Sequence, residues 1–192
     1  MNTDTMQDVP VSEGGRVCPW ERVRHFDNFL RPLVHNPRKL FGPYVQPGMT
    51  VLDVGCGRGF ASLGLARLVG EDGMVISADL QPEMLEMVKE RAASTGLMER
   101  ITFHRCEPGR IGVRARVDFA VAFWMVHEVP DIEAFLREMR AILSPGGRFF
   151  LAEPKMHTSQ LEFDSTVEKS VAAGFAVLHK PKVLFSRAVV LG

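Results

Sequence analysis

The sequence is poor in cysteine and carries no net charge. Only three cysteines, Cys18, Cys56 and Cys106, occur among 192 residues, and none forms a Cys-x-x-Cys pair with another. An odd and widely spaced set fits neither a disulfide framework nor a zinc site, so we expect reduced thiols, a cytoplasmic chain and no metal site. The 23 basic residues balance 23 acidic ones, which argues against a dedicated nucleic-acid binder.

Long apolar runs are also missing. The longest, Phe119 to Val126, is far shorter than the ~20 residues that a membrane-spanning helix needs. The N-terminus has no basic region followed by an apolar core, so the sequence predicts neither a secreted nor a membrane protein. With 192 residues, the chain fits the rough range of 100–200 residues for one domain.

Two leading segments precede the main folded region. Residues 1–15 are polar and acidic without periodicity, which is typical of a disordered tail. Residues 16–48 have apolar positions at helical spacing that Pro32 and Pro37 interrupt, so we expect short helices separated by turns. Because the rest of the chain has little inserted material, this helical leader is expected to form a substrate cover.

Residues 49–192 alternate strand and helix patterns and form the predicted domain. Strands are expected at 49–54, 74–78, 101–105, 117–123, 148–152, 175–179 and 184–191, with a helix in each gap between the first six except the gap between the third and the fourth. This alternation predicts an α/β fold in which helices cover both faces of a mostly parallel, seven-stranded sheet. The last two strands are joined too closely for a crossover, so we expect them to form an antiparallel pair.

The segment VLDVGCGRGF, residues 51–60, is the most informative part of the sequence. A strand runs directly into Gly55, Gly57 and Gly59, and a helix begins behind them. Glycines let the backbone approach a ligand closely, and the helix N-terminus offers free N–H groups. Cys56 stands where the turn needs a small residue, which favours packing over reactivity. The glycines alone are shared by many nucleotide-binding folds.

Two carboxylates make the ligand more specific. Asp53 lies within the end of the first strand and Asp79 ends the second, at the edge where open sheets bind ligands. A carboxylate at the end of the second strand is well placed to bond ribose hydroxyls, whereas Asp53 would repel a pyrophosphate and attract an ammonium group. Phe60 replaces the third glycine of the dinucleotide fingerprint, and no Walker A lysine follows. The pattern favours a nucleoside with a positively charged tail.

In its motifs and their order, the chain resembles the class I S-adenosylmethionine-dependent methyltransferases. Their first motif is similar to VLDVGCGRGF, and the second to SADLQPEML, residues 77–85. VDFAVAFWMVHEVPD, residues 117–131, resembles the fourth strand and its turn, and LSPGGRFFLAEP, residues 143–154, the approach to the fifth strand. The resemblance implies a Rossmann-like fold, S-adenosylmethionine as cofactor, and a small-molecule acceptor of the quinone-biosynthesis-like group.

The same resemblance implies a set of cofactor-binding residues. Asp53 and the glycine turn would hold the methionine part, while Asp79 and Leu80 would contact the ribose and the adenine. After the third strand the family usually has an aspartate near the adenine amine, where this chain has Cys106 and Glu107. Phe123 would border the methyl-transfer region, and Tyr44 of the leader is expected near the cofactor.

His127 and Glu128 are the titratable pair at the end of the fourth strand. A histidine there is a candidate general base, because its pKa lies near neutrality. An equally weighted interpretation is a histidine that holds the loop through a backbone hydrogen bond. Glu128 is expected to face solvent or to cap the next helix.

Several functions compete with methyl transfer to an unidentified small-molecule acceptor. The chain is alternatively a non-catalytic module that binds S-adenosylmethionine or S-adenosylhomocysteine and regulates a partner. A nicotinamide oxidoreductase is disfavoured by Asp53 and by the missing third glycine. Arsenic-type thiolate chemistry would need cysteines that converge.

The oligomeric state is a separate question. A homodimer through the closing strands or through the leader is one arrangement that the pattern allows.

Overall fold

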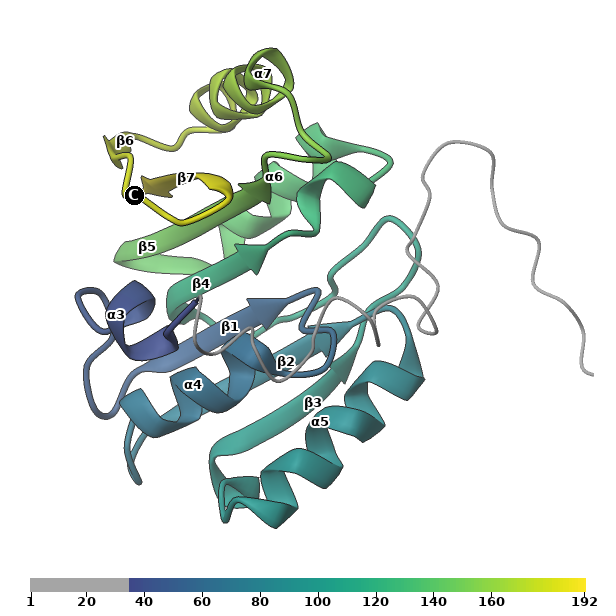
Figure 1. Cartoon of the computed structure of the whole chain (residues 1–192), viewed down its shortest axis with the longest axis vertical. Helices are drawn as coiled ribbons and strands as arrows, with labels where there is room; N and C mark the ends of the chain where they lie inside the picture. The colour runs from purple at the N-terminus through teal and green to yellow at the C-terminus, as the bar shows by residue number, and fades with distance from the viewer. Residues whose placement is uncertain (1–34) are drawn as a thin grey trace, which may run out of the picture.

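The computed structural model describes residues 35–192, which form one seven-stranded sheet with the strand order β3-β2-β1-β4-β5-β7-β6 (Figure 1). Strands β1 to β5 are parallel to one another, whereas β7 is antiparallel to both β5 and β6. The strands are β1 (Thr50–Val54), β2 (Met74–Asp79), β3 (Ile101–Arg105), β4 (Val117–Phe123), β5 (Leu143–Pro154), β6 (Val177–His179) and β7 (Ser186–Leu191).

The helices cover both faces of this sheet. Figure 1 shows α4 and α5 in front of the strands and α6 behind them. The helices are α3 (Pro37–Phe41), α4 (Phe60–Leu68), α5 (Pro82–Ser94), α6 (Ile132–Ile142) and α7 (Gln160–Ala172), with short 3-10 turns η1 (Met98–Arg100) and η2 (Val126–Glu128). The predicted α/β class, the seven strands and the antiparallel closing pair are confirmed.

The buried residues form two main clusters, one on each face. Along β1, Val51 packs into the cluster that contains α4, and its neighbour Leu52 packs into the cluster that contains α6. Successive side chains of a strand point to opposite faces, so a strand buried on both sides must be apolar almost throughout. In β4 every residue except Asp118 is buried, as such a central strand requires.

Local sequence signals set the helix starts. Pro82 occupies the first turn of α5, and the Asp131 side chain caps α6 by accepting a hydrogen bond from the Ala134 backbone N–H at 2.9 Å. Helix α7 begins with a capping box: the Glu162 N–H donates to the Ser159 hydroxyl at 3.2 Å, and the Ser159 N–H donates to the Glu162 carboxylate at 2.7 Å. These caps fix where the connecting loops end.

Strand limits differ from expectation at the C-terminal end. β6 is confined to Val177–His179, and β5 begins at Leu143, ahead of the Pro-Gly-Gly segment that was expected to form a turn before the strand. The register of β4 against β5 shifts between Val117 and Phe119, so the extra residues form an irregularity within the pairing.

The described part of the leader, residues 35–48, contains the short helix α3. The expectation that Tyr44 lies near the cofactor is wrong. Its ring stacks on Phe119 with centroids 5.8 Å apart, and Phe119 pairs with Val51 near the start of β1, far from the carboxyl ends of the strands. Its hydroxyl lies 3.0 Å from Nε2 of His179. The stacking on Phe119 therefore holds the Tyr44 ring toward the amino end of the sheet, away from the glycine turn.

The predicted tail at 1–15, the first part of the leader at 16–34, and Cys18, Trp20, Phe26 and Phe29 lie outside the described residues. Among residues 35–192, no helix is long and apolar enough to cross a membrane.

Candidate active site

The glycine turn after β1 combines close packing with open space. Gly55, Gly57 and Gly59 have φ angles of +66°, +49° and +81°, which favour glycine. A Cβ on Gly55 would lie 2.8 Å from Cγ of Met125, and one on Gly59 would lie 3.0 Å from Val88. A Cβ on Gly57 would meet nothing within 4 Å. The first and third glycines are thus required by packing, and the second borders open space where a ligand can approach the backbone.

Asp79 connects the end of β2 to this turn. One carboxylate oxygen accepts a hydrogen bond from the Gly57 N–H at 2.9 Å, and the other accepts one from the Gln81 N–H at 3.0 Å. Burial raises the pKa of Asp79, whereas these N–H donors act to lower it. The predicted glycine turn and the predicted acidic residue therefore lie together at the carboxyl edge of the sheet.

Asp53 lies below the turn and is more enclosed than the sequence suggests. It is only 2% exposed, and the Ser62 hydroxyl donates a hydrogen bond to its carboxylate at 2.5 Å. The Ser77 hydroxyl in turn donates to the Ser62 hydroxyl at 2.7 Å. The carboxylate is thus held in a buried polar chain that joins β1, α4 and β2, and its contact with a methionine group stays a prediction.

The two cysteines in the described region belong to the same neighbourhood as Asp79. The Cys56 N–H donates to the carbonyl of Ala78 at 3.0 Å, and the Cys106 N–H donates to that of Asp79 at 2.8 Å. Burial raises the pKa of the Cys56 thiol well above its usual value. Burial and the nearby Asp79 raise the pKa of Cys106 to about 12. Both thiols are therefore protonated at neutral pH and are poor nucleophiles.

The remaining predicted cofactor residues occupy less direct positions. Leu80 is partly buried beside Asp79, whereas Glu107 is exposed in a tight turn whose backbone pairs with Arg110. Phe123 is 6% exposed, and its ring lies 5.6 Å from that of Phe60, so it points into the core on the α4 side of the sheet. Their roles in binding the cofactor stay predictions.

Trp124 redirects the chain immediately after β4. Its φ angle is +67°, a left-handed conformation that is rare for a large residue. Its backbone N–H donates to the carbonyl of Ala152 at 2.7 Å, and its indole N–H donates to the Ser186 hydroxyl at 2.8 Å. These bonds attach the turn that follows β4 to both β5 and β7.

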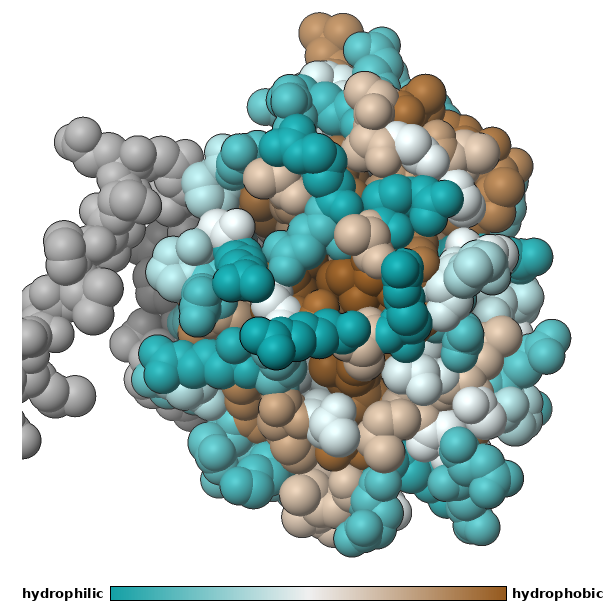
Figure 2. Space-filling view, turned by 180° about the vertical axis from the view of Figure 1, so that it is seen from behind, coloured by the Kyte–Doolittle hydropathy of each residue, from teal (hydrophilic) through white to brown (hydrophobic). Residues whose placement is uncertain are grey.

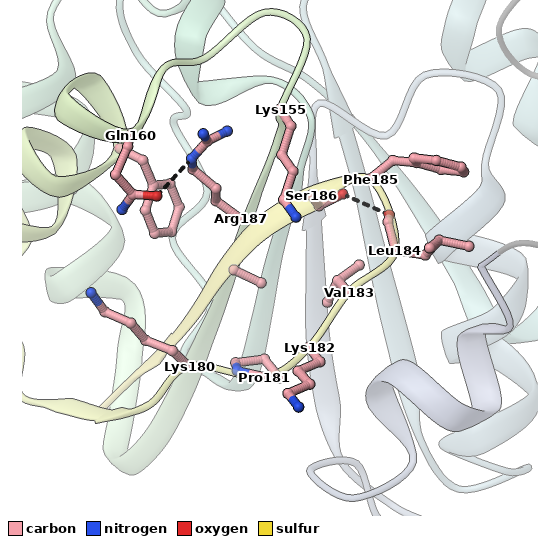
Figure 3. A pocket seen from close by; sticks show the side chains of 12 residues that line it. Lys155, Gln160, Lys180, Pro181, Lys182, Val183, Leu184, Phe185, Ser186 and Arg187 are labelled. Carbon is pink, nitrogen blue, oxygen red and sulfur yellow. Dashed lines mark hydrogen bonds between the residues drawn. The ribbon is translucent and has the colours of Figure 1, made fainter.

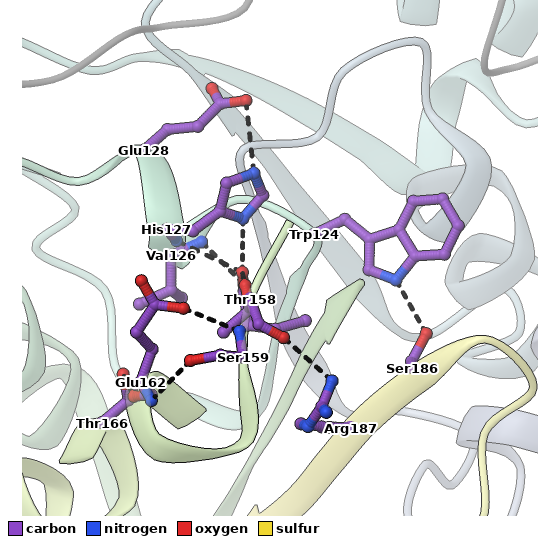
Figure 4. Close-up of polar contacts among 11 residues, drawn as sticks. Trp124, Val126, His127, Glu128, Thr158, Ser159, Glu162, Thr166, Ser186 and Arg187 are labelled. Carbon is purple, nitrogen blue, oxygen red and sulfur yellow. Dashed lines mark hydrogen bonds and ion pairs between the residues drawn. The ribbon is translucent and has the colours of Figure 1, made fainter. Parts of the chain in front are cut away.

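His127, in η2, lies directly against Glu153 near the end of β5. Figure 4 shows the His127 ring with Glu128 on one side and Thr158 on the other. Its Nδ1 makes a short hydrogen bond to the Glu153 carboxylate. That carboxylate is 1% exposed and also accepts hydrogen bonds from the backbone N–H groups of Val126 at 2.9 Å and His127 at 3.3 Å, and from the Thr158 hydroxyl at 3.2 Å. The His127 ring is therefore hydrogen-bonded to a carboxylate, whereas one of the two interpretations of this histidine from the sequence expected a backbone partner.

Sequence reasoning missed Glu153. Its only signal was an acidic residue at the end of the otherwise apolar run FFLAEP, residues 149–154. Met125 was also missed, although its contact with Gly55 brings the turn that carries His127 beside the glycine loop.

Acidic neighbours set the protonation of His127. Burial tends to lower its pKa, but the hydrogen bond and the charge of Glu153, with smaller effects from Glu128 and Glu162, raise it above the usual 6.5. Glu128 lies 3.8 Å from Nε2, on the opposite side of the ring from Glu153. The site can therefore accept and hold a proton near neutral pH.

Comparison with known proteins identifies the family of the chain. Residues 45–182 match the family model described as a methyltransferase domain. The chain belongs to this methyltransferase-domain family. The resemblance to class I S-adenosylmethionine-dependent methyltransferases is thereby confirmed.

Relatives of this methyltransferase domain differ in their named substrates. The chain is 34% identical to the ubiquinone/menaquinone biosynthesis C-methyltransferase UbiE of Cellvibrio japonicus over 57% of its own length, and 33% identical to the arsenite methyltransferase of Halobacterium salinarum over the same share. These alignments span 44% and 28% of those two proteins, so the chain spans less than half of either. A S-adenosylmethionine-dependent methyltransferase structure from Aquifex aeolicus has 25% identity and a TM-score of 0.79, with 90% of this chain and 97% of that chain covered.

A basic groove, distinct from the glycine turn, is lined by residues 180–185 and by the start of β7 in the methyltransferase domain (Figure 3). Its volume is about 670 Å³, and none of the predicted cofactor residues lines it. Four cationic side chains surround it: Lys155, Lys180, Lys182 and Arg187. Lys180 pairs with Asp164 at 3.6 Å, and Arg187 donates hydrogen bonds to the Gln160 side chain at 3.0 Å and to the Thr158 carbonyl at 2.9 Å.

The opposite face of the domain has a smaller hollow. Figure 2 shows, from behind, apolar surface that lies between hydrophilic side chains. A second cavity, of about 450 Å³, is lined by Ile76 of β2, by β3 residues that include Thr102 and His104, and by Val113 of the following loop. In the described part of the chain, no helix lies between β3 and β4, so a loop alone covers this part of the sheet.

Proposed function

We propose that the chain transfers the methyl group of S-adenosylmethionine to a small-molecule acceptor. The observation that carries the proposal is the hydrogen bond between Asp79 and Gly57, which joins the carboxylate at the end of β2 to an open glycine turn at the carboxyl edge of a methyltransferase fold. The UbiE and arsenite methyltransferase relatives are matched over 44% and 28% of their lengths, so both the activity and the acceptor are proposed here for this protein.

The residues present fit the cofactor. Open space beside Gly57 admits a ligand to the backbone, and Asp79 is positioned to receive ribose hydroxyls once a ligand competes for its oxygens. We assign the methionine part to Asp53, Gly55, Cys56, Gly57 and Gly59, and the adenosine to Asp79, Leu80, Cys106 and Glu107, with Phe123 bordering the methyl group. The bound sulfonium supplies an already activated methyl group, so alignment and exclusion of water are what the chain must provide.

The two cysteines among residues 35–192 favour an organic acceptor over arsenite. Arsenic chemistry uses thiolates, whereas the pKa of Cys106 is raised to about 12 and Cys56 is buried. One relative is named as a ubiquinone/menaquinone biosynthesis C-methyltransferase, which supports a small organic molecule as the acceptor. None of the relatives named above is described as a regulatory protein, and no observation favours the non-catalytic alternative.

The proposal extends to the setting of the reaction. The widely spaced cysteines support a cytoplasmic enzyme, and the balance of 23 basic and 23 acidic residues supports an acceptor other than nucleic acid. A homodimer through the edge strand β6 is compatible with its exposed side chains.

Calorimetry with S-adenosylmethionine and S-adenosylhomocysteine tests the binding step. We expect one site per chain for each compound, and NADH should not compete. Release of S-adenosylhomocysteine with a panel of phenols and quinols then tests turnover. Binding without release for any acceptor in the panel would favour the regulatory alternative, and the absence of binding would exclude both.

A further inference from the structure

We propose that His127 accepts the proton of the methyl acceptor and that Glu153 is the positioning residue that holds its ring, so the acceptor reacts through an acidic hydroxyl group such as that of a phenol or an enol. This inference rests on the proposed methyl transfer and names the chemistry of its second substrate. Three features of the described residues carry it: the hydrogen bonds of Glu153, the location of the turn, and the charges around the ring.

The hydrogen bonds determine which ring nitrogen is available. An ionised carboxylate only accepts hydrogen bonds, so the short contact to Glu153 requires a proton on Nδ1 of His127. In the neutral imidazole, Nε2 then carries the lone pair. The ring thus presents its basic nitrogen on the side away from β5, with Glu128 at 3.8 Å.

Glu153 is itself held rigidly. Its buried carboxylate accepts hydrogen bonds from the backbone N–H groups of Val126 and His127 and from the Thr158 hydroxyl. The same carboxylate therefore fixes both the backbone and the ring of His127. A buried charge with this many donors is better explained by orientation of a working group than by stability, because burial of an ion is costly.

The turn lies where the methyl group is expected. Met125, two residues before His127, contacts Gly55 closely enough that a Cβ there would clash. The two segments end neighbouring strands, since β1 pairs with β4. His127 thus lies on the same edge of the sheet as the glycine turn that we assign to the methionine part.

Every acidic group around the ring favours the imidazolium that proton transfer creates. Glu153 faces it from β5, Glu128 from η2 and Glu162 from α7, while the ring of His157 stacks parallel to it at a centroid distance of 5.9 Å. These groups raise the pKa of His127 and so make it a stronger base than a free histidine.

The proposed step conserves atoms and electrons. The acceptor O–H bond breaks and its proton passes to Nε2 of His127. The oxygen lone pair forms the new bond to the methyl carbon as the carbon–sulfur bond breaks, and that bonding pair stays on sulfur. The proton later leaves the imidazolium for solvent.

Nitrogen-15 NMR of the histidine ring tests the positioning role without an acceptor. We expect the wild-type protein to have the Nδ1–H tautomer of His127. Glu153→Leu, which leaves Nδ1 without this acceptor, should lose that preference, and Glu153→Gln, which keeps an acceptor oxygen but not the charge, should titrate at a lower pH. Glu128→Gln, which removes a neighbouring charge but keeps the Nδ1 bond, should retain the tautomer. An Nε2–H tautomer of His127 in the wild type would overturn the proposal, and this measurement does not depend on any variant folding. A His127 titration that is the same in Glu153→Gln and in the wild type would also overturn it.

A phenol probe tests the hydroxyl acceptor. The probe is 4-nitrophenol, added to the complex of the protein with S-adenosylhomocysteine at a pH below the pKa of the phenol. The bound phenol should show the phenolate absorption band in the wild type and should not show it in His127→Gln. A wild-type spectrum without that band, or an equal band in the variant, would contradict the assignment. Calorimetry on the same samples separates the two proposals. If the wild type does not bind S-adenosylhomocysteine, the result argues against methyl transfer. If it binds this compound but shows no phenolate band that depends on His127, the result argues only against proton transfer.

Discussion

The carboxylate of Asp79 accepts a hydrogen bond from the Gly57 backbone N–H at 2.9 Å, across a sequence separation of 22 residues. This contact joins the end of β2 to the glycine turn after β1, two segments that carry most of the cofactor-binding residues we assign. A ligand that takes over the Asp79 oxygens must also engage the turn, so the carboxylate and the turn act on the cofactor together.

The charge of Asp79 should dominate cofactor binding. Asp79→Asn keeps the shape but removes the ionised acceptor, and hydrogen bonds to charged groups contribute about 1.5–3 kcal/mol. We therefore expect the affinity for S-adenosylhomocysteine to fall roughly 10–100-fold by calorimetry. Asp72→Asn, at an exposed loop position, is the matched control and should bind normally. Equal affinity of Asp79→Asn and wild type would remove the ribose assignment.

Gly57 should matter for binding beyond its backbone conformation. Gly57 and Gly146 both have positive φ angles, and a Cβ at either position would meet nothing within 4 Å. Alanine at each should therefore destabilise the fold by a similar amount, about 1–2 kcal/mol. Only Gly57→Ala should also weaken S-adenosylhomocysteine binding, because its methyl group enters the ligand space. Thermal unfolding with and without the ligand distinguishes the two effects, and a parallel response of both variants would contradict the assignment.

The polar chain below the glycine turn should contribute to stability. Ser62→Ala removes the hydroxyl that connects Asp53 with Ser77 and should lower the free energy of unfolding by about 1–3 kcal/mol, as expected for a buried hydrogen-bonded acceptor. Ser94→Ala, at the exposed end of α5, should change it little. Urea unfolding measures both, and a Ser62→Ala protein as stable as wild type would show that the chain is dispensable.

His127 should make stability depend on pH in a defined direction. Its folded-state pKa is raised above the usual 6.5, so the folded protein binds the proton more tightly than the unfolded chain does. This contribution is fully present below about pH 6.5 and is lost as the pH rises through the folded-state value. The stability of wild type relative to His127→Gln should therefore decline from pH 5.5 to pH 9 in urea unfolding, and a rising difference would refute the assigned shift.

Cys106 should react slowly despite its partial exposure. With a pKa of about 12, against about 8.5 for a free thiol, its thiolate population at neutral pH is lower by roughly a thousandfold or more. Iodoacetamide should label Cys106 slower by that order than it labels a model thiol, in a Cys18→Ser background followed by mass spectrometry. Labelling at the rate of a free thiol would reopen the case for thiolate chemistry.

Much of the fold could be predicted because strand and helix periods are local signals. The strand ends placed Asp53 and Asp79 correctly beside the glycine turn, since neighbouring parallel strands end at one edge. Asp131 was correctly identified as a helix cap from its position before an apolar stripe.

The missed residues depend on contacts between strands. Glu153 gains its role only because β5 lies beside β4, a neighbour relation that no single segment encodes. Tyr44 was misplaced because an aromatic ring in a leader carries no information about which buried partner it meets, here Phe119 at the amino end of the sheet. The basic groove likewise gathers Lys155 and Lys182 from separate loops.

Trp124 keeps a left-handed backbone where glycine would be unstrained, so its large ring must compensate. Its indole N–H bonds Ser186 at the start of β7, and its backbone N–H bonds β5. The final strand of the chain thereby serves as an anchor for the histidine turn. β7 also pairs with β5 directly, with Arg187 opposite Glu153, so the same strand supports His127 from two sides, through Trp124 and through its carboxylate partner.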